Sequence, residues 1–587
     1  MSRFANIADV RAIELYQLLS QTAARVPNNK AVSFQLLSGP KDKAETMTWK
    51  QYHGKVTQVA NLFRSLGVGE GDVVAYVLPN CNEATTVLIG GCVAGIANPI
   101  NPLLEPEHIA SILRETKAKL VVTLRAFPKT DVAQKVAEAV ADAPGVTHVL
   151  EVDLLRYLTP PKSWIVPLIR PKNPVSHHAK VLDFTAEVAK QPADRLSFDD
   201  SKEDRVAAYF HTGGTTGMPK VAQHKYSGMI YNGWLGHTLL FDDTDTIICP
   251  LPLFHVFACH VILMAMIASG AHVVFPTPQG YRGEGVFDNF WKLVERWGVT
   301  FIITVPTAIS AMMQRPVNAD VSTVKTAFSG SSPLPLELFR RFEKATGVTL
   351  VEGYGLTEAT CLVSVNPVEG TDEVGEICID NPGVFEGSTY TESDKNIDLF
   401  HDDIYLRTGD LGRIDEDGYL WITGRAKDLI IRGGHNIDPA EIEEALAGHE
   451  AVAMAGAIGQ PDAFAGELPC VYVELVDGGK VTIEELKAHC DEHVHERAAR
   501  PKHIEIMDEL PKTAVGKVFK PDLRKRAITR VYNAALKEAG LAAEVVRVVE
   551  SKNRGLVAQV KKTGNVEEAD VPRVLGEFTR PWEWDDA

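Results

Sequence analysis

Strand-like and helix-like patterns alternate between residues 48 and 152, and this alternation restricts the fold more than any other feature of the chain. Apolar side chains recur at helical spacing in residues 48–66, where Thr48 and Gln51 are placed to form a capping box. Because such alternation is typical of a mostly parallel sheet covered by helices on both faces, the sequence predicts an α/β fold. The further segments are strand-like at residues 73–78, 119–124 and 148–152, and helical at residues 84–94, 105–115 and 132–141.

The chain has 587 residues, which is too long for one compact core, so we expect several domains. The composition changes after Gly424, and the next hundred or so residues combine helical patterns with a strand-like alternation. We therefore expect a large α/β domain at residues 1–424 and a small α+β domain at residues 425–530. Residues 531–587 are interpreted as a helical extension rich in Glu and Lys, with no predicted role.

The composition is that of an ordinary soluble globular protein, with 45% apolar and 23% charged residues. A net charge of −17 argues against a broad nucleic-acid surface, which needs clustered Lys and Arg. The eight cysteines show no Cys-x-x-Cys spacing, so we expect reduced thiols and a cytoplasmic location. No signal peptide is recognisable, and the most apolar stretch, residues 256–275, is interpreted as a buried helix followed by a strand.

Residues 211–220 read His-Thr-Gly-Gly-Thr-Thr-Gly-Met-Pro-Lys, and a short strand-like run at residues 205–210 precedes them. Three glycines and two neighbouring threonine hydroxyls suit an anionic ligand, most simply a phosphate. This glycine loop lacks the Gly-Lys-Ser/Thr of the common phosphate loop and the Gly-x-Gly-x-x-Gly of a dinucleotide fold. A helical pattern is expected after the loop, which could also be a simple strand-to-helix turn.

Residues 154–173 interrupt the alternation. They hold four prolines and mix Trp164, Ile165 and Ile169 with basic side chains. Two interpretations stay open, namely an ordered surface loop or lid, and a basic–aromatic patch that makes a weak contact with a membrane surface or a partner. Composition does not separate these two interpretations.

Further short motifs combine glycines with hydroxyl, carboxylate, aromatic or cationic side chains, and each one alone could be turn chemistry. They lie at residues 252–258, 328–335, 353–360, 405–412, 424–441 and 510–517. With this set in this order, the chain resembles the adenylate-forming superfamily of acyl-CoA synthetases from about residue 10 to about residue 527. The resemblance implies a large N-terminal α/β domain of several subdomains and a small, mobile α+β C-terminal domain.

The resemblance also implies an ATP site. The glycine loop would hold the β- and γ-phosphates, Tyr354 would stack on the adenine, and Asp410 would accept hydrogen bonds from the ribose with help from Arg425. Thr357 would bind the α-phosphate, and Glu358 would hold Mg²⁺, which needs no dedicated cage beside phosphate oxygens and water. The expected nucleotide-binding residues are Thr212, Gly213, Gly214, Thr215, Thr216, Gly217, Lys220, Gly330, Ser331, Ser332, Gly353, Tyr354, Gly355, Thr357, Asp410, Arg425 and Lys517.

Four residues are expected to carry the chemistry, namely Lys517, Thr357, Glu358 and His255. The Lys517 ammonium would offset the repulsion between the acyl carboxylate and the α-phosphate in the transition state. His255 would close the carboxylate end of the acyl pocket, and the alternative for it is a satisfied core histidine. The expected acyl pocket consists of His255, Phe257, Val261, Gly330, Ser331, Gly353, Gly355, Cys361 and Leu362. This set contains no acidic or permanently cationic side chain, which favours an apolar acyl or aryl chain over an amino acid.

Enzymes of this family rotate the small domain after the acid has been adenylated. Lys427 occupies the family's hinge position, and the glycine-containing turn after it would line the passage for the pantetheine arm of CoA. The residues expected in that passage are Arg432, Gly433, Gly434 and His435. The implied reaction partners are a small carboxylic acid, ATP and CoA, with Mg²⁺ as cofactor.

The leading hypothesis is an AMP-forming acid–CoA ligase that acts through an acyl adenylate, as a monomer or a homodimer. One alternative is an acyl-AMP ligase that loads a carrier protein, and another is a nucleotide-binding sensor without turnover. The absence of a fused carrier domain weighs against the first alternative, whereas Lys517, Glu358 and the glycine loop weigh against the second. The length of the acid, and whether it is alkyl or aryl, is not predicted.

Overall fold

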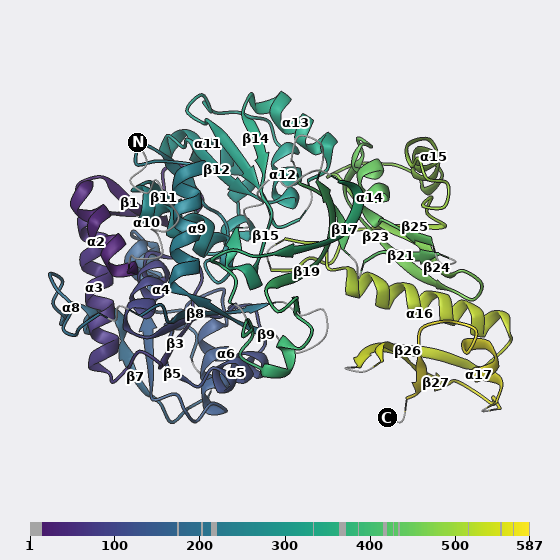
Figure 1. Ribbon diagram of the computed structural model, residues 1–587, viewed down its shortest axis with the longest axis horizontal. Helices are drawn as coiled ribbons and strands as arrows, with labels where there is room; N and C mark the ends of the chain where they lie inside the picture. The colour runs from purple at the N-terminus through teal and green to yellow at the C-terminus, as the bar shows by residue number, and fades with distance from the viewer. Residues whose placement is uncertain are drawn as a thin grey trace.

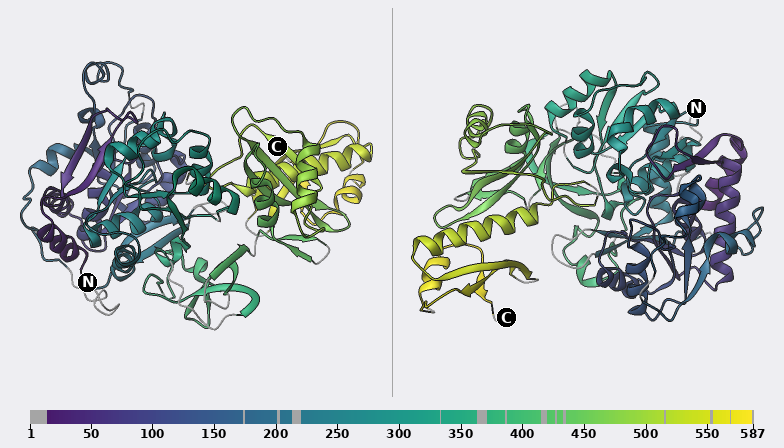
Figure 2. Two further views of the ribbon diagram at one scale, coloured as in Figure 1. Left: turned by 90° about the horizontal axis from the view of Figure 1, so that it is seen from above. Right: turned by 180° about the vertical axis from the view of Figure 1, so that it is seen from behind.

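Figure 1 shows a large N-terminal part beside a smaller C-terminal part, with the long helix α16 (Lys520–Glu538) bordering the smaller part. The two further views in Figure 2 show the same division. The computed structural model describes residues 14–172, 175–200, 203–212, 220–332, 334–362, 371–385, 387–414, 420–425, 428–432, 435–514, 516–551, 554–567 and 569–585.

The alternating segments form a seven-stranded sheet, called sheet 1 below, with the order β7-β6-β5-β3-β4-β8-β9. All neighbouring strands are parallel except β8 and β9, which are antiparallel. The predicted, mostly parallel sheet is therefore confirmed. Its strands are β3 (Val73–Val77), β4 (Ile96–Pro99), β5 (Ala118–Leu124), β6 (His148–Val152), β7 (Lys180–Asp183), β8 (Val206–Thr212) and β9 (Lys220–Lys225).

A second seven-stranded sheet, sheet 2, has the order β14-β13-β12-β10-β11-β1-β2 and again ends in one antiparallel pair, β1 with β2. The sequence pattern contained several of these strands but did not show that they form a separate sheet. The strands are β1 (Lys30–Gln35), β2 (Ala44–Thr48), β10 (Thr246–Ile248), β11 (His272–Phe275), β12 (Phe301–Thr304), β13 (Thr326–Ser329) and β14 (Thr349–Glu352).

Helix α4 lies between the two sheets, because it contacts β1 of sheet 2 and β3, β4 and β8 of sheet 1. Every side chain of α4 is buried, as expected for a helix without a polar face. Helix α3 begins at the predicted capping box, with Thr48 and Gln51 bonding each other's backbone N–H groups. The helices of this part are α2 (Leu15–Arg25), α3 (Trp49–Ser65), α4 (Asn82–Ala94), α5 (Pro106–Glu115), α6 (Val132–Ala141), α7 (Lys162–Ile165), α8 (Phe184–Ala189), α9 (Tyr226–Leu239), α10 (Ala265–Ser269), α11 (Val286–Trp297), α12 (Pro306–Met313) and α13 (Leu336–Thr346).

Two local predictions need correction. A strand, β9, follows the glycine loop, and the predicted helix begins only at Tyr226 because residues 220–225 first pair with β8. The apolar stretch at residues 256–275 forms a buried helix and a strand as predicted, but its first part, η2 (Phe257–Met264), is a π-helix. In the described part of the chain, no helix is both long and apolar enough to cross a membrane.

A four-stranded sheet connects the two parts of the molecule, with β19 at its centre beside β17, β18 and β20. Short elements around it carry several of the predicted site motifs. These elements are β15 (Gly355–Leu356), β16 (Cys361–Leu362), β17 (Thr371–Ile379), β18 (Phe400–His401), β19 (Tyr405–Ile414) and β20 (Leu420–Arg425), with the short helices η1 (Leu154–Tyr157), η3 (Gly280–Arg282), η4 (Thr357–Ala359) and η5 (Ser393–Asn396).

The small C-terminal part is an α+β unit, as predicted, built on the sheet β22-β21-β24-β23 with β25 parallel to β24. It has its own cluster of buried apolar side chains, separate from that of the large part. Helix α15 starts at a capping box formed by Thr482 and Glu485. The elements are β21 (Ile430–Arg432), β22 (His435–Ile437), β23 (Val452–Asp462), β24 (Gly466–Leu475), β25 (His503–Met507), α14 (Pro439–Ala447) and α15 (Ile483–His493).

The helical interpretation of residues 531–587 is wrong for most of the segment. Helix α16 continues past residue 530, and a three-stranded sheet of order β26-β27-β28 follows it. This sheet packs on α16 through a third apolar cluster. The elements are β26 (Ala543–Ser551), β27 (Gly555–Lys562), α17 (Asp570–Leu575) and β28 (Trp582–Trp584).

Candidate active site

The glycine loop joins the antiparallel strands β8 and β9 at one side of sheet 1. Thr212 at the end of β8 pairs with Lys220 at the start of β9, so the two strand ends flank the loop. Ligands of parallel α/β sheets bind at the carboxyl ends of the strands, which is where β8 ends. Five predicted phosphate-binding residues lie outside the described residues, namely Gly213, Gly214, Thr215, Thr216 and Gly217, and so does the side chain of Thr212.

Lys220 is linked to the predicted metal residue through Tyr390. The Lys220 ammonium lies 4.7 Å from the centre of the Tyr390 ring, and the Tyr390 hydroxyl donates to Glu358 Oε1 at 2.5 Å. Burial and the charge of Glu358 raise the pKa of Tyr390, so the phenol keeps its proton and remains a donor. Glu358 is therefore held by a tyrosine that no sequence motif indicated.

Glu358 fits the Mg²⁺ role that the resemblance implies. Its carboxylate supplies the hard oxygen ligand that this cation prefers. Within the described ranges, no group of three or more His, Cys, Asp or Glu side chains could hold a metal by itself. An ion at Glu358 would therefore take its remaining ligands from nucleotide oxygens and water.

Tyr354, Asp410 and Arg425 form one hydrogen-bonded cluster. The Tyr354 hydroxyl donates to Asp410 Oδ2 at 2.7 Å, and Arg425 Nε donates to Asp410 Oδ1 at 2.7 Å. Asp410 and Arg425 are paired on the neighbouring strands β19 and β20. A carboxylate has about four acceptor positions, so Asp410 can still accept hydroxyl groups of a ribose. The structure thus brings together the three residues predicted for the adenosine.

Glycines allow a close approach of backbone and aromatic rings in the predicted adenine and acyl region. A Cβ at Gly330 would lie 2.8 Å from Phe257 Cζ, and one at Gly353 would lie 2.0 Å from Phe328 Cζ. Either distance is too short for a carbon–carbon contact, so a larger residue would push a ring out of place. The two predicted glycines are therefore required by the packing around them.

Backbone strain is concentrated in the same region. Ser331, Thr360 and Cys361 have φ angles of 79°, 54° and 89°. A side chain other than glycine rarely adopts a positive φ, least of all a β-branched one such as Thr360. Strain of this kind clusters at ligand sites, where the surrounding structure must hold the backbone in place.

Lys517 reaches this region from the small C-terminal part. It follows the loop after β25, where Lys517 N donates to Thr513 Oγ1 at 3.1 Å. Burial and the positive charge of Arg425 lower the pKa of Lys517 to about 8, while the carboxylates of Asp410 and Glu358 act in the opposite direction. These electrostatic neighbours place the ammonium among the residues predicted for the ribose and the metal.

The backbone of this loop also packs on the large part. Gly516 has a φ of 83°, and a Cβ there would lie 2.7 Å from Thr307 Oγ1 on α12. A second contact between the parts is the hydrogen bond from Ser310 Oγ to the Ala453 carbonyl at 2.9 Å. Helix α12 therefore forms part of the surface on which the small C-terminal part sits.

His255 is neutral in the structure and has one defined tautomer. Burial, with smaller effects of Lys517 and His211, lowers its pKa to about 3. Phe257 N donates to His255 Nδ1 at 3.3 Å, so the proton of the neutral ring is on Nε2. An Nε2–H can donate to a carboxylate oxygen, which suits the predicted position at the carboxylate end of the acyl pocket.

A cavity of about 900 Å³ lies between the two parts of the molecule, and Phe254 lines it whereas the neighbouring His255 does not. Asn80, Leu103 and Phe254 line it from the large part, and Thr513 and Gly516 line it from the Lys517 loop. Its volume is that of a small-molecule site. Eight of the nine predicted acyl-pocket residues do not line this cavity, and the side chain of the ninth, Leu362, lies outside the described residues. Phe257, Val261 and Cys361 are instead buried in the core.

The predicted hinge and CoA passage are only partly visible. Arg432 pairs with His435 across β21 and β22, and its guanidinium donates to the Ala498 carbonyl at 2.6 Å. Lys427, Gly433 and Gly434 lie outside the described residues, as does the side chain of His435. The roles of these residues therefore stay predictions.

Sequence reasoning also missed His224 and His260. His224 Nε2 donates to the Thr357 carbonyl at 2.7 Å, and His224 Nδ1 lies 2.8 Å from His260 Nε2. The only signal available was His260 within an apolar segment, and such a histidine is usually structural; His224 stands between Gln223 and Lys225 with no such signal.

Comparisons with known proteins show the family of the chain. The family model for the AMP-binding enzyme matches residues 19–374, and the model for the AMP-binding enzyme C-terminal domain matches residues 441–517. The marinolic acid–CoA ligase of Pseudoalteromonas sp. (strain SANK 73390) is 34% identical over 577 residues, covering 89% of this chain and 85% of that protein. A long-chain-fatty-acid–CoA ligase of Bacillus subtilis (strain 168) is 29% identical over 545 residues, covering 86% and 93%.

Solved structures share the fold. An anthranilate CoA ligase in complex with anthranoyl-AMP has a TM-score of 0.76 at 24% identity and covers 90% of this chain and 99% of that one. ATP-bound MatB from Rhodopseudomonas palustris has a TM-score of 0.71 at 24% identity and covers 87% and 98%. The predicted fold class is confirmed. The chain therefore belongs to the AMP-binding enzyme family, the acyl-CoA synthetases of the adenylate-forming superfamily, which use ATP, Mg²⁺ and CoA.

Proposed function

We propose that this chain joins an apolar carboxylic acid, fatty or aryl, to CoA through an acyl-adenylate intermediate. One observation carries the proposal. Lys517 belongs to the small C-terminal part, yet its loop packs on Thr307 of the large part. Burial and the charge of Arg425 lower its pKa to about 8, while Asp410 and Glu358 of the predicted nucleotide site act in the opposite direction. A lysine brought from a separate domain to a nucleotide site has little purpose in a protein that only binds the nucleotide.

In the first half-reaction, a carboxylate oxygen of the acid attacks the α-phosphorus of ATP, and the bond to pyrophosphate breaks. We assign to Lys517 the stabilisation of the charge that builds up between the two anions. The Thr357 hydroxyl binds the α-phosphate, and the His255 Nε2–H donates to the acid. Mg²⁺ held by Glu358 neutralises phosphate charge when it is bound.

In the second half-reaction, the CoA sulfur attacks the acyl carbon as a thiolate, and the carbon–oxygen bond to AMP breaks. The thiol proton goes to the solvent. We assign the passage for CoA to Arg432, Gly433, Gly434 and His435, and the hinge that exposes it to Lys427. Separate apolar cores in the two parts support a movement of residues 425–530 against residues 1–424.

The acid is proposed to be apolar because the assigned pocket contains no ionised side chain. The relatives that act on marinolic acid and on long-chain fatty acids support this choice. We place the enzyme in the cytoplasm, as a monomer or homodimer. The assigned pocket is His255, Phe257, Val261, Gly330, Ser331, Gly353, Gly355, Cys361 and Leu362.

A screen of carboxylic acids for pyrophosphate release, with and without CoA, tests the proposal. Acid-dependent pyrophosphate together with acyl-CoA is the expected result. Pyrophosphate without acyl-CoA would replace this function with the loading of a carrier protein. If no acid released pyrophosphate, the chain would be a nucleotide sensor and the proposed reaction would be wrong.

A further inference from the structure

The segment at residues 154–172 is held firmly at both ends. At its start, the buried Tyr157 donates to Glu83 Oε2 at 2.8 Å, and Arg156 pairs with Glu83 at 3.1 Å. At its end, Arg170 pairs with Asp153 at 2.9 Å and donates to the Ala126 carbonyl at 2.7 Å. Two ion pairs and two further hydrogen bonds thus fix the position of the residues between them.

Between these anchors, the segment exposes a continuous set of large apolar side chains. Trp164 is 70% exposed and Leu168 is 84% exposed, with Ile165 and Ile169 beside them. The spacing of one, four and five residues puts all four on one side of the short helix α7 and the turns after it. Val166 points inward and is buried, so the segment is packed on the protein through its other side.

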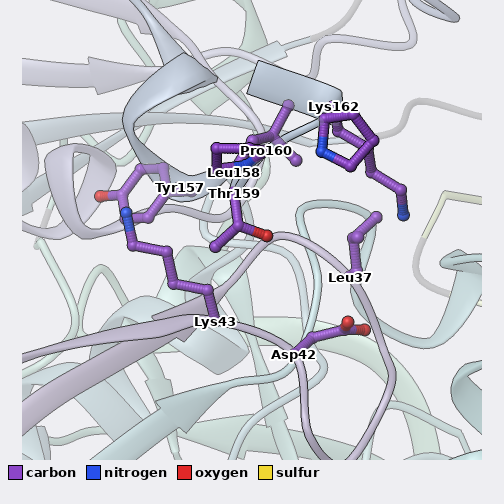
Figure 3. A pocket seen from close by; sticks show the side chains of 9 residues that line it. Leu37, Asp42, Lys43, Tyr157, Leu158, Thr159, Pro160 and Lys162 are labelled. Carbon is purple, nitrogen blue, oxygen red and sulfur yellow. The ribbon is translucent and has the colours of Figure 1, made fainter. Parts of the chain in front are cut away.

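A small-molecule site does not explain this exposure. The pocket under the segment, shown in Figure 3, has a volume of only about 90 Å³, whereas ligand pockets hold about 300–1,000 Å³. Lys43 and Lys162 flank this pocket but do not point toward one common position. The Lys43 ammonium instead donates a hydrogen bond to the Arg156 carbonyl. The exposed apolar side chains outside the pocket therefore indicate contact with a larger surface rather than with a small-molecule ligand.

The charge of the segment indicates which kind of surface. Residues 154–172 contain four basic residues and no Asp or Glu, in a chain of net charge −17. Arg156 and Arg170 are neutralised by ion pairs, whereas Lys162 and Lys172 form none within the described ranges. Exposed lysines beside Trp and aliphatic side chains match an anionic lipid surface, where Trp prefers the interface.

The position of residues 154–172 in the fold is a further argument for contact with a lipid surface. It follows the carboxyl end of β6, and all strands of sheet 1 from β7 to β8 are parallel. The carboxyl ends of β3 and β4 continue into Asn80 and Leu103, which line the cavity of about 900 Å³. The exposed apolar residues therefore lie at the same edge of sheet 1 as the glycine loop and the cavity.

We propose that residues 162–172 form a docking surface for an anionic lipid bilayer, into which Trp164, Ile165, Leu168 and Ile169 insert while Lys162 and Lys172 contact headgroups. The anchored ends make this a preformed surface, so no folding of the segment accompanies binding. The proposal does not depend on which acid the enzyme activates.

Co-sedimentation of the full chain with vesicles tests the proposal. The protein should pellet with mixed phosphatidylglycerol–phosphatidylcholine vesicles, less with phosphatidylcholine alone, and less as salt rises. The variant W164S/L168S should lower the partition coefficient at least about tenfold. K162Q and K172Q should each lower it about fivefold, and only on anionic vesicles.

Leu239→Ser with Ile397→Ser provides the matched control, because these two side chains are similarly exposed elsewhere on the molecule. This control should stay within about twofold of the unchanged protein. Equal pelleting of W164S/L168S and the unchanged protein, with both retaining their melting temperature, would overturn the proposal. So would an absence of pelleting at low salt, which would leave a protein partner as the occupant.

A second inference concerns the buried histidines and rests on the proposed function of Thr357 and Glu358. The His224 Nε2 atom must carry a proton because its partner, the Thr357 carbonyl, can only accept. Burial lowers the pKa of His224 to about 4, so the ring is neutral and its Nδ1 accepts from His260 Nε2–H. Phe210 stacks on His224 with ring centres 5.0 Å apart and holds this orientation.

We infer that His224, backed by His260 from the π-helix η2, is a positioning residue that fixes the turn carrying Thr357 and Glu358. Its hydrogen bond goes to the backbone of that turn, one residue before the carboxylate assigned to Mg²⁺. Groups behind a metal ligand commonly set its orientation, and π-helical segments often lie at functional sites.

The test compares His224→Ala with His224→Gln, whose side-chain N–H can replace the lost donor. Binding of Mn²⁺–ATP, followed by electron paramagnetic resonance, should weaken about tenfold in H224A and recover mostly in H224Q. The KM for the acid should not change. Equal weakening in both variants, or an equal change in the KM for the acid, would show a merely structural role.

If H224A does not fold, His260→Asn against His260→Leu makes the same comparison one residue further back. H260N keeps a donor toward His224 and should bind Mn²⁺–ATP more tightly than H260L, whereas equal binding would contradict the inference. Failure of the unchanged protein to bind Mn²⁺–ATP would instead count against the proposed function itself.

Discussion

Two lysines five residues apart on the same loop have opposite environments. Lys512 pairs with Glu474 at 2.8 Å, within the small C-terminal part. Lys517 forms no ion pair within the described ranges, and its pKa is lowered to about 8 by burial and Arg425. One end of the loop therefore holds the small C-terminal part together, while the other end supplies charge to the large part.

This difference distinguishes the lysine proposed to be catalytic from its neighbour. From the sequence alone, either residue could be a solvated surface lysine. What separates them is the glycine before Lys517, whose φ of 83° turns the backbone toward Thr307. Lys517, which has no ion pair within the described residues of the small C-terminal part, is therefore the lysine that we propose acts on the substrate.

The largest effect is expected for Lys517→Ala. Loss of a key electrostatic group should lower the rate of acid-dependent pyrophosphate release about 10²–10³-fold. Conversion of a supplied acyl adenylate to acyl-CoA should be retained, because Lys517 is proposed to leave the site before that step. An equal loss in both half-reactions would contradict the two-conformation assignment.

Gly516→Ala should have the next largest effect. A Cβ would meet Thr307 Oγ1 at 2.7 Å, so the loop must shift and move the Lys517 ammonium. We expect adenylation to slow about ten- to hundredfold. Gly540→Ala is the matched control, since Gly540 has a φ of 69° but no atom within 4 Å of its added Cβ. Similar rates for the two variants would remove the role assigned to the contact with Thr307.

How far the sequence predicts this arrangement depends on the range of the interactions. The capping box of α3 and the proline that starts α5 act over a few residues, and both were predictable. Tyr390 and His224 contact residues 32 and 133 positions away, at Glu358 and Thr357, and no local pattern indicates such pairs. The resemblance to the family identified Lys517 as a site residue. Only the structure shows that Lys517 lies near Arg425.

The prediction for the C-terminal tail, residues 531–587, was wrong for a different reason. Its Glu and Lys content favoured a helix, but the run Val-Val-Arg-Val-Val at residues 545–549 is typical of a strand. Strand β26 buries Val545 against α16, while its charged side chains face outward. Composition averaged over the tail hid this short alternation.

The pH dependence should follow the lowered pKa of Lys517. Burial lowers it from the ordinary value of 10.5 to about 8, and the ammonium is the active form. The kcat/KM for adenylation should therefore be steady below pH 8 and fall about tenfold per unit above it. The CoA half-reaction should instead rise with pH, because it needs the thiolate. A fall of both rates in parallel would argue against Lys517 as the titrating group.

The smallest effect is expected for Lys512→Ala, which removes the ion pair with Glu474. Both side chains are about one-fifth exposed, so the pair should contribute about 1 kcal/mol to the stability of the small C-terminal part. Adenylation should change less than about threefold, because Glu474 of the small C-terminal part already pairs with the Lys512 ammonium. Chemical denaturation and pyrophosphate release measure the two quantities, and Glu474→Gln should reproduce both results. A loss of activity in K512A approaching that of K517A, at unchanged stability, would mean that the chemistry is spread along the loop rather than confined to its end.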